Sequence, residues 1–599
     1  MKTTCSILLA SAALLGTACQ QPKEAPSFRL ENYGDTVAVL VTSPTKYILL
    51  PVQEDQPEAV VRLNTGNEVE DVWMDVRLAR DTVDYYVPFK LGEGQTARID
   101  ILNLPQEAVA LNLLQLSDTF DKSNREYYRP AYHFTPAYGW MNDPNGMTYL
   151  NGEYHLFYQY NPYGSKWGNM HWGHAVSSDM IHWTELDPAI ARDNYGQIFS
   201  GSSYIARLPK GAEGTDPFKA DILLPGNGTE GDFIASYYTS DNGKLERALQ
   251  EQQSFAISTD GGRTYRKYGA PVLKSDGRRD FRDPKLFWNE QRNEWGMIVS
   301  ADNEMQFYGS KNLRDWTYVS AFGDGYGVQP RQFECPDFFS LPLEGQKDKW
   351  VMIVNVNPGF WFGGSGSEYF TGSFDGNQFK CDNKKETVKW LDWGKDHYAA
   401  VTFSCEPQGR VISMPWMSNW QYANDLPTRQ YRSQMGMARE LFAFVSGNDT
   451  YVGQRPVAEM LSLLKPAQTE TLANGIQLTE ADKPLCIDLD MKNGTSFTLA
   501  NPEGEKVVFT AAEGRITMNR QQSGIIPTQD FPVDTWAPVA QLCGKQDSYH
   551  LQLWIDKCSI EMFVDGGKAV MTNLVYPHSP YNTLKGEGIS NIKVSEIAL

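Results

Sequence analysis

The chain has 599 residues, more than one hydrophobic core usually serves, so we expect two or three domains. Its formal net charge of −19 argues against nucleic acid as a partner, because phosphate backbones are bound by basic surfaces. The 50 glycines, 30 tyrosines and 28 phenylalanines, together with many short apolar runs, predict a β-rich protein with frequent turns.

The first residues indicate export. Lys2 precedes a mostly apolar run that is too short for a mature transmembrane helix and typical of a signal peptide. The tetrapeptide GTAC at residues 16–19 resembles a bacterial lipoprotein cleavage box, with Gly where Leu is preferred. The resemblance implies a signal peptide at residues 1–18, lipidation of Cys19 and a tether at 19–27. Ordinary secretion of a soluble product is the alternative.

Three regions of strand-like sequence follow. Residues 28–125 alternate apolar and polar positions, as in DTVAVLVTS, and predict an accessory N-terminal β domain. Residues 130–450 carry a repeat of short strands and turns, which predicts a catalytic domain built as a five-bladed β-propeller. Residues 465–599 alternate again, as in KVVFTAA and CSIEMFVDG, and predict a C-terminal β-sandwich. The expected fold class is therefore all-β.

The repeat in the middle region rests on four segments, which begin SSDMIHW at Ser177, STDGGRTY at Ser258, SKNLRDW at Ser310 and SFDGNQF at Ser373. Each has Ser, then Asp or Asn two residues on, then an aromatic residue. Each also follows a strand-like run. Such a unit is typical of propeller blades, and a fifth blade is expected around YAAVTFS and VISMPWMSNW.

Three acidic residues precede these repeats: Asp143 in WMNDPNG, Asp283 in FRDPK and Glu334 in ECPD. The first strand of each propeller blade lines the central channel, so acids at matching positions in different blades would converge on one funnel. The alternative is three unrelated surface turns, since Asn-Asp-Pro-Asn-Gly is dense in turn formers. Unrelated turns would not explain why the acids lie at similar positions before the repeats, or why they share an Asp-Pro sequence context.

Paired carboxyl groups suggest glycosidic bond cleavage. With retention of configuration, one carboxylate attacks the anomeric carbon while the other carboxyl group protonates the leaving oxygen. Neighbouring asparagine amides would keep Asp143 ionised, as a nucleophile requires. Phenylalanines around Glu334 would partly desolvate it, as suits a general acid. Arg282 would keep Asp283 charged and able to stabilise positive charge in the transition state.

These three motifs, in this order, resemble the hallmark motifs of glycoside hydrolase family 32, the fructan hydrolases and invertases. FYQYNP, WGNMHWGHA, FSGS and WMSNWQYANDLPT agree with the same family, and the resemblance covers roughly residues 130–599. It implies a five-bladed propeller followed by a sandwich, and similar bacterial fructanases carry an extra N-terminal β domain. One departure is Phe333, where the family often has Trp before the acid.

The resemblance also implies roles for individual residues. Asp143 would be the nucleophile, Glu334 the acid/base and Asp283 the transition-state stabiliser. Six further residues match positions around the terminal fructosyl unit: Asn142, Gln159, Trp167, Phe199, Ser200 and Arg282. Trp420 would form a wall of the same pocket, with Trp416 as its competitor.

Each of these assignments has a structural alternative. Gln159 and Ser200 could satisfy channel-lining backbone, and Trp167 could belong to a core. His171 and His174 suggest a metal site at first sight, but in a strand they would face opposite sides. We therefore expect no metal and no organic cofactor. Cys335 is interpreted as a small buried residue and not as a nucleophile.

The sequence thus predicts a retaining, exo-acting β-fructosidase for levan or inulin, with a fructan or fructo-oligosaccharide as its partner. It would lie on the outer membrane surface or in the periplasm, in contact with the membrane only through Cys19. Endo action, fructosyl transfer on the same scaffold and non-catalytic fructan binding are the alternatives. Exo action follows from the deep pocket common in the family, whereas linkage preference depends on the loops around the funnel.

Overall fold

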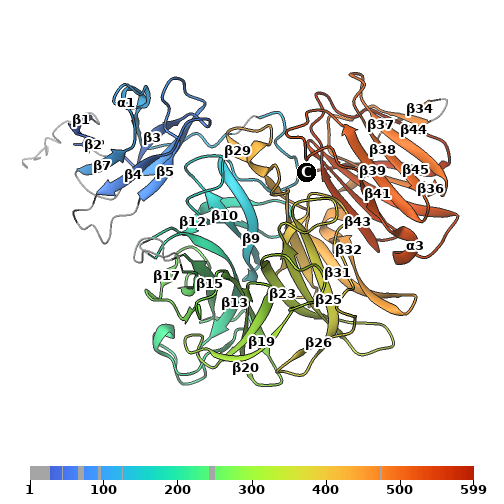
Figure 1. Ribbon diagram of the computed structural model, residues 1–599, viewed down its shortest axis with the longest axis horizontal. Helices are drawn as coiled ribbons and strands as arrows, with labels where there is room; N and C mark the ends of the chain where they lie inside the picture. Colours follow the sequence, from blue (N-terminus) through green and yellow to red (C-terminus); the bar gives the residue numbers. More distant parts are fainter. Residues whose placement is uncertain are drawn as a thin grey trace, which may run out of the picture.

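The computed structural model describes residues 27–599 apart from 43–44, 65, 67–72, 92–95, 124–125, 194, 242–249, 468 and 473–474. The predicted signal peptide and Cys19 lie outside these residues. The described chain folds into an N-terminal unit, a central propeller and a C-terminal sandwich, coloured from blue to red in Figure 1. No helix in this part of the chain is long and apolar enough to cross a membrane. The predicted all-β fold class is confirmed.

The N-terminal unit contains a five-stranded sheet, in the order β1-β2-β7-β4-β5, and a three-stranded sheet, β6-β3-β8. Val37, Val39 and Val41 alternate along β2 and are fully buried between the sheets, as the period of two predicts. The elements are β1 (Phe28–Tyr33), β2 (Thr36–Val41), β3 (Tyr47–Val52), β4 (Ala59–Asn64), β5 (Trp73–Val76), β6 (Tyr85–Lys90), β7 (Ala97–Leu102), α1 (Ala110–Leu113) and β8 (Gln115–Ser117).

The central unit is a propeller in which five sheets surround one axis. The innermost strands β9, β13, β19, β23 and β27 contact one another in that order, and β27 returns to β9. A parallel bridge between Thr148 and Ser404 closes the ring, with Tyr149 N donating to Ser404 O at 3.0 Å. The ring brings residues that are far apart in sequence to one channel.

The strands of the five blades are as follows. Blade 1 has β9 (Gly139–Leu150), β10 (Glu153–Asn161), β11 (His171–Ser177) and β12 (Thr184–Ile190); blade 2 has β13 (Ile198–Arg207), β14 (Leu224–Pro225), β15 (Phe233–Ser240), β16 (Gln252–Ser258), β17 (Arg266–Lys267) and β18 (Leu273–Lys274). Blade 3 has β19 (Phe281–Asn289), β20 (Glu294–Ala301), β21 (Glu304–Ser310) and β22 (Thr317–Phe322); blade 4 has β23 (Phe333–Leu341), β24 (Lys349–Val356), β25 (Gly366–Phe374) and β26 (Phe379–Cys381). Blade 5 has β27 (Tyr398–Thr402), β28 (Ile412–Met417), β30 (Gln434–Met435), β31 (Arg439–Ser446) and β32 (Asp449–Pro456). Outside these sets, η1 (Pro217–Lys219) and η2 (Ala423–Asp425) are short 3₁₀ turns, and β29 (Tyr431–Arg432) pairs in parallel with β9.

The four Ser-x-Asp/Asn repeats occupy equivalent turns in blades 1 to 4, which follow β11, β16, β21 and β25. In blade 1, Ser177 Oγ donates to Asp179 Oδ1 at 2.9 Å, and in blade 2, Ser258 Oγ donates to Asp260 Oδ1 at 2.8 Å. These carboxylates then accept backbone N–H groups of the following residues, which fixes the turn. The repeat in the sequence is therefore a turn motif repeated in the fold.

Each innermost strand contains a β-bulge, where two of its residues face one residue of the neighbouring strand, and β9 contains two. The bulged residues Asp283, Cys335 and Ala399 have φ of 63°, 42° and 52°. Such bulges bend a strand and redirect its side chains, here at one end of the channel. The bulges are bounded or formed by Pro144, Pro284 and Pro336, which the strand tolerates at these positions because no ladder bond is needed there.

The C-terminal unit is a sandwich of a six-stranded sheet, β33-β45-β36-β41-β42-β43, and a seven-stranded sheet, β34-β35-β44-β37-β38-β39-β40. Leu489, Phe497, Phe509 and Leu551 lie in its core with no exposed surface or almost none. After α2 (Ala458–Leu461), the elements are β33 (Leu464–Pro466), β34 (Thr469–Leu472), β35 (Gly475–Leu478), β36 (Leu485–Lys492), β37 (Thr495–Ala500), β38 (Lys506–Ala512), β39 (Arg515–Gln522), β40 (Thr535–Ala537), α3 (Val539–Leu542), β41 (Ser548–Asp556), β42 (Ser559–Val564), β43 (Ala569–Leu574), β44 (Thr583–Gly586) and β45 (Ile589–Ile597).

Buried ion pairs connect the propeller to the sandwich. His133 Nδ1 lies 2.8 Å from Asp556 Oδ2, and its Nε2 lies 2.9 Å from Glu561 Oε2. Arg439, also fully buried, pairs with Glu561 at 2.5 Å and with Asp392 at 2.9 Å. Because an unpaired charge is costly away from water, this network favours one relative placement of the two units.

The N-terminal unit holds the propeller loop that follows β10. Asp75 N donates to Asn169 Oδ1 at 2.9 Å, and Asn169 Nδ2 donates back to Asp75 O at 2.8 Å. Ser165 N donates to the hydroxyl of Tyr85 at 3.0 Å, and that hydroxyl lies 3.0 Å from Ser165 Oγ. Trp167 lies in the same loop, between these two anchors.

Candidate active site

Asp143 lies in a bulge of β9 and is 8% exposed. Its Oδ2 accepts a hydrogen bond from Ser200 Oγ at 2.8 Å and one from Cys335 Sγ at 3.4 Å. Its Oδ1 is equally buried but accepts none within the described residues. Donors from two other blades therefore fix one oxygen and leave the other oxygen without a partner in the free site.

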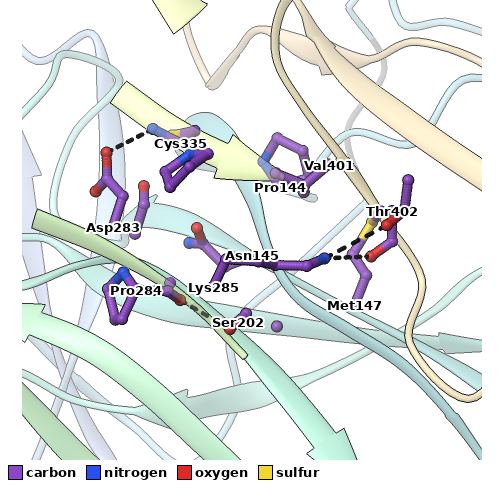
Figure 2. Close-up of a pocket in the computed structure, with 14 residues that line it drawn as sticks. Pro144, Asn145, Met147, Ser202, Asp283, Pro284, Lys285, Cys335, Val401 and Thr402 are labelled. Atoms are coloured by element: carbon purple, nitrogen blue, oxygen red, sulfur yellow. Dashed lines mark hydrogen bonds between the residues drawn. The ribbon is translucent and has the colours of Figure 1, made fainter. Parts of the chain in front are cut away.

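Asp283 lies in the bulge of β19 and is 5% exposed. Its backbone N–H donates to Thr239 Oγ1 at 2.9 Å, and its Oδ2 accepts the backbone N–H of Cys335 at 2.8 Å. Figure 2 shows this second bond above the small cavity in the channel. Cys335 therefore contacts both aspartates, with its thiol on Asp143 and its N–H on Asp283.

Glu334 is the second residue of β23 and directly precedes Cys335, so the third carboxyl group lies at the same point. Its Oε1 accepts from Arg282 Nη1 at 3.1 Å and from Gln332 Nε2 at 3.1 Å. Its Oε2 accepts from the hydroxyl of Tyr398. The three predicted acids thus meet at one end of the channel.

The sequence prediction was wrong about the phase of Glu334. Asp143 and Asp283 directly precede a proline, but in the third motif that position holds Cys335. Glu334 lies one residue earlier, at the position of Arg282. The expected aromatic surroundings were also wrong, because Phe333 and other nearby rings pack into the blade core while Glu334 faces polar groups.

Burial controls the pKa of both aspartates. It raises the pKa of Asp143, and the charge of Glu334 adds to this effect, while Ser200, Asn142 and Cys335 oppose it. Burial raises the pKa of Asp283 to about 8, although the Arg282 guanidinium opposes the shift. Asn142 and Arg282 do lower these pKa values, as the sequence predicted, but burial outweighs them.

Comparison with known proteins agrees with this fold. The model described as Glycosyl hydrolases family 32 N-terminal domain matches residues 133–456, and the family 32 C terminal model matches residues 465–596. The first of these covers more than half of the chain. The chain belongs to glycosyl hydrolase family 32. A third model, Domain of unknown function (DUF4980), matches residues 34–132.

Several curated relatives of this family 32 chain are similar over most of its length. A levanase from Bacillus subtilis (strain 168) is 38% identical over 491 residues, which cover 78% of this chain and 69% of the relative. An extracellular exo-inulinase from Aspergillus ficuum is 32% identical over 490 residues, which cover 75% and 90%. The recognised family and the glycoside hydrolase class predicted from the sequence are therefore confirmed.

Solved structures of family 32 members share the fold. The exo-inulinase from Aspergillus awamori superposes with a TM-score of 0.68 at 29% identity and covers 80% of this chain and 99% of its own. The β-fructofuranosidase from Schwanniomyces occidentalis, complexed with fructosyl-erythritol, gives 0.65 at 30% identity, with 78% and 97% covered. The predicted propeller and sandwich are confirmed by these matches.

Other predicted residues of the family 32 site lie close to the acids. Ser200 contacts Asp143 directly, and Arg282 contacts Glu334. Asn142 is 3% exposed and accepts the indole N–H of Trp140 at 2.7 Å. Gln159 is 2% exposed and donates to Ile198 O at 3.0 Å, so part of its hydrogen-bonding capacity serves the channel backbone.

The predicted aromatic residues differ in exposure. Trp167 is 41% exposed, and its ring lies 6.4 Å from that of Phe199, so it is not a core residue. Trp420 is partly buried and stacks on Trp140 at 5.9 Å. Trp416 has no exposed surface, so it packs beneath Trp420 and cannot form a wall open to ligand.

Two residues that contact Glu334, Tyr398 and Gln332, were not predicted from the sequence. Tyr398 precedes the bulged Ala399 in blade 5, as Glu334 precedes the bulged Cys335 in blade 4. Extending the blade alignment to the fifth blade would have found Tyr398. Gln332 lies just before β23 in a connecting segment, where no repeat marks it.

The histidines pack as expected. His174 is 1% exposed, and its Nε2 lies 3.1 Å from Nδ1 of His155. Its ring stacks on that of Phe157, with the ring centroids 4.2 Å apart. Burial lowers the pKa of His171 to about 4, and its Nδ1 contacts Asn169 O. Within the described residues, no group of His, Cys, Asp or Glu has an arrangement that could hold a metal ion.

Proposed function

We propose that the protein is a retaining β-fructosidase that releases fructose from fructans such as levan or inulin. The single observation that carries the proposal is the position of Cys335, which contacts Asp143 and Asp283 and directly follows Glu334. Relatives described as a levanase and exo-inulinases support a fructan as the substrate. The chemistry requires no metal or organic cofactor.

In the first step, Asp143 Oδ1 attacks the anomeric carbon of the terminal fructosyl unit. The bond from that carbon to the glycosidic oxygen breaks, and Glu334 gives its proton to the departing oxygen. Ser200 and Cys335 hold Oδ2 of Asp143, so the attacking oxygen is the one that accepts no hydrogen bond in the free site. A covalent fructosyl–enzyme ester results.

In the second step, Glu334 removes a proton from water, and the water oxygen attacks the same carbon. The ester bond breaks, fructose leaves and both carboxyl groups return to their starting states. Asp283, once ionised, would stabilise the positive charge that develops on the sugar ring in both transition states. Substrate contacts would come from Asn142, Gln159, Trp167, Phe199, Ser200, Arg282 and Trp420.

Exo action is part of the proposal. The N-terminal unit holds the loop of Trp167, and the Trp167 ring lies against Phe199. A loop held in this way suits a pocket for a chain end more than an open groove. Chromatography of the products from levan and inulin tests this point. Free fructose alone supports exo action, whereas a ladder of oligosaccharides would support an endo-levanase, and new oligosaccharides at high sucrose would support a fructosyltransferase.

The role of Asp143 is tested with Asp143→Asn, which keeps the shape of the side chain and removes the nucleophile. We expect hydrolysis of levan and sucrose to fall by about 10³-fold or more. The matched control is Asp547→Asn on the exposed surface of the sandwich, which should retain full activity. Hydrolysis by Asp143→Asn near that of the control would refute the proposal.

The role of Glu334 is tested with Glu334→Ala. This variant should regain part of its first step with a substrate whose leaving group needs no proton, and azide should replace water in the second step. A rate that depends on neither would contradict the acid/base role.

We also propose that the protein is exported and anchored by a lipid on Cys19. Relatives described as extracellular exo-inulinases support export, and the GTAC tetrapeptide supports the anchor. In cells, Cys19→Ser should move the enzyme from the membrane fraction to the soluble fraction. An unchanged membrane fraction would contradict the anchor.

A further inference from the structure

A cavity of about 380 Å³ lies where blades 4 and 5 of the propeller meet the C-terminal sandwich. Four tryptophans line it: Trp361, Trp390 and Trp393 from the propeller and Trp536 from β40. Its volume falls within the ~300–1,000 Å³ range of small-ligand sites. Asp143, Asp283 and Glu334 are not among the described residues that line this cavity. The cavity is therefore distinct from the carboxylate site.

One of the four indole rings, that of Trp361, remains exposed beside this cavity. Trp393 and Trp536 stack with their centroids 5.9 Å apart and an interplanar angle of 26°. Trp361 lies 5.6 Å from Trp393 and 6.0 Å from Trp536, and it remains 51% exposed. An interface that served only to join two units would be close-packed, and it would not leave an indole half exposed beside unfilled space.

Trp390 adds an independent observation. It is 2% exposed, and its indole N–H has no hydrogen-bond partner within the described residues. Buried N–H groups are almost always paired, because an unpaired one costs its full desolvation free energy. Trp390 lines the cavity, so the wall of the cavity contains an unpaired hydrogen-bond donor.

Polar groups around the rings indicate the ligand class. Glu513, Arg515 and Gln541 also line the cavity, so charges of both signs and an amide are present. The Arg515 guanidinium lies 3.8 Å from the centre of the Trp536 ring. Indole faces accept the C–H faces of a sugar ring, and the polar groups accept or donate to its hydroxyls. The combination suits a neutral polyhydroxylated molecule better than an anion or a lipid.

We propose that this tryptophan cavity is a second carbohydrate-binding site, which holds a segment of a fructan chain outside the carboxylate pocket. The identity of the sugar rests on the proposed function. The segment of residues 357–365 carries both Trp361 and Ser365, and Ser365 Oγ accepts the backbone N–H of Trp420 at 3.2 Å. A polymer bound at the cavity would therefore keep its ends at a raised local concentration near the pocket.

The first test compares polymer and disaccharide kinetics in Trp361→Ala. We expect its KM for levan to rise about fivefold or more, with kcat and all constants for sucrose unchanged, because sucrose fills only the pocket. The control is Tyr318→Ala, which removes an aromatic ring of similar exposure, 54%, on blade 3. An unchanged KM for levan in Trp361→Ala would overturn the proposal.

The second test measures binding without hydrolysis, in gels that contain levan or dextran, and uses the Asp143→Asn background. Trp390→Phe removes the indole N–H together with the five-membered ring and keeps one aromatic ring, so the fold should be retained. Levan in the gel should slow the migration of Trp361→Ala and of Trp390→Phe less than it slows the migration of their parent. Equal retardation of parent and variants, or equal retardation by dextran and levan, would overturn the proposal. Failure of the proposed function would appear separately, as a wild-type enzyme that releases no fructose.

Discussion

The backbone N–H of Cys335 donates to Asp283 Oδ2 at 2.8 Å, across two blades of the propeller. The bond depends on two bulged residues, since Asp283 and Cys335 both have positive φ. It brings a buried carboxyl group beside two others, and the close packing that positions the acids also withdraws them from water. The burial that positions the acids for catalysis therefore lowers the stability of the fold. Substitutions at the acids can measure this loss of stability.

We expect Asp283→Asn to abolish most activity and to stabilise the fold at alkaline pH. The folded-state pKa of Asp283 is about 8, well above the unfolded value near 3.9, so the free energy of unfolding falls as pH rises between them. Asn carries no such titration and still accepts the N–H of Cys335. Relative to the wild type, the free energy of unfolding of the variant should be higher by on the order of 2–5 kcal/mol at pH 8 and little changed at pH 4. Calorimetry at both pH values checks this.

Activity and control complete that prediction. The kcat/KM of Asp283→Asn should fall by about 10²–10³-fold, the loss typical of one charge-stabilising group. Asp547→Asn, on the exposed surface, should change neither activity nor the midpoint of unfolding. Asp283→Asn would contradict the account if it were destabilised equally at pH 4 and pH 8.

Cys335 provides a second prediction. Burial raises the pKa of its thiol well above the usual range, so it remains a thiol and does not react as a nucleophile. Cys335→Ser keeps a donor for Asp143, whereas Cys335→Ala removes it. We expect kcat to fall by about tenfold in the Ala variant, and less in the Ser variant, because one hydrogen bond to a charged group is lost. A Ser variant as inactive as Asp143→Asn would show that Cys335 has a larger role.

Local sequence predicted much of this molecule, and long-range contacts explain what it missed. The Ser-x-Asp turns revealed the blades because each turn is built from residues that are close in sequence. Glu334 was found from its motif, but its partner Tyr398 was not, since 64 residues and a blade boundary separate them. Sequence neighbours predicted groups that lower the pKa of Asp143, whereas the burial that raises it depends on residues from other blades.

His133 gives a stability prediction at the boundary between propeller and sandwich. Burial alone would lower its pKa, but Glu561 and Asp556 outweigh this and raise it to about 9. Its contribution to stability should therefore be complete below about pH 6.5 and be lost as pH rises to 9. His133→Gln should lower the free energy of unfolding, measured with urea, by about 3 kcal/mol at pH 6 and by much less at pH 9.5.

The same network sets an acid limit and offers a control. The pKa values of Asp556 and Glu561 are lowered, despite their burial, by His133 and Arg439 respectively, so their contribution is present above about pH 4 and lost as pH falls through the lowered values. His182→Gln, at a half-exposed surface position, should have no effect at either pH. A His133→Gln penalty that is equal at pH 6 and 9.5 would count against a protonated His133.

The N-terminal unit is expected to act on substrate affinity through the loop of Trp167. Tyr85→Phe removes the hydroxyl that contacts Ser165 N and Oγ, and Asn169→Ala removes both bonds to the backbone of Asp75. Each variant should raise the KM for sucrose by about threefold to tenfold and leave kcat nearly unchanged, because a mobile Trp167 weakens binding without moving the acids. Tyr33→Phe, at an exposed hydroxyl on the same unit, is the control. Both variants should also lower thermal stability slightly, so the decisive result is a change in KM without a change in kcat. An unchanged KM would mean that the N-terminal unit does not position the loop.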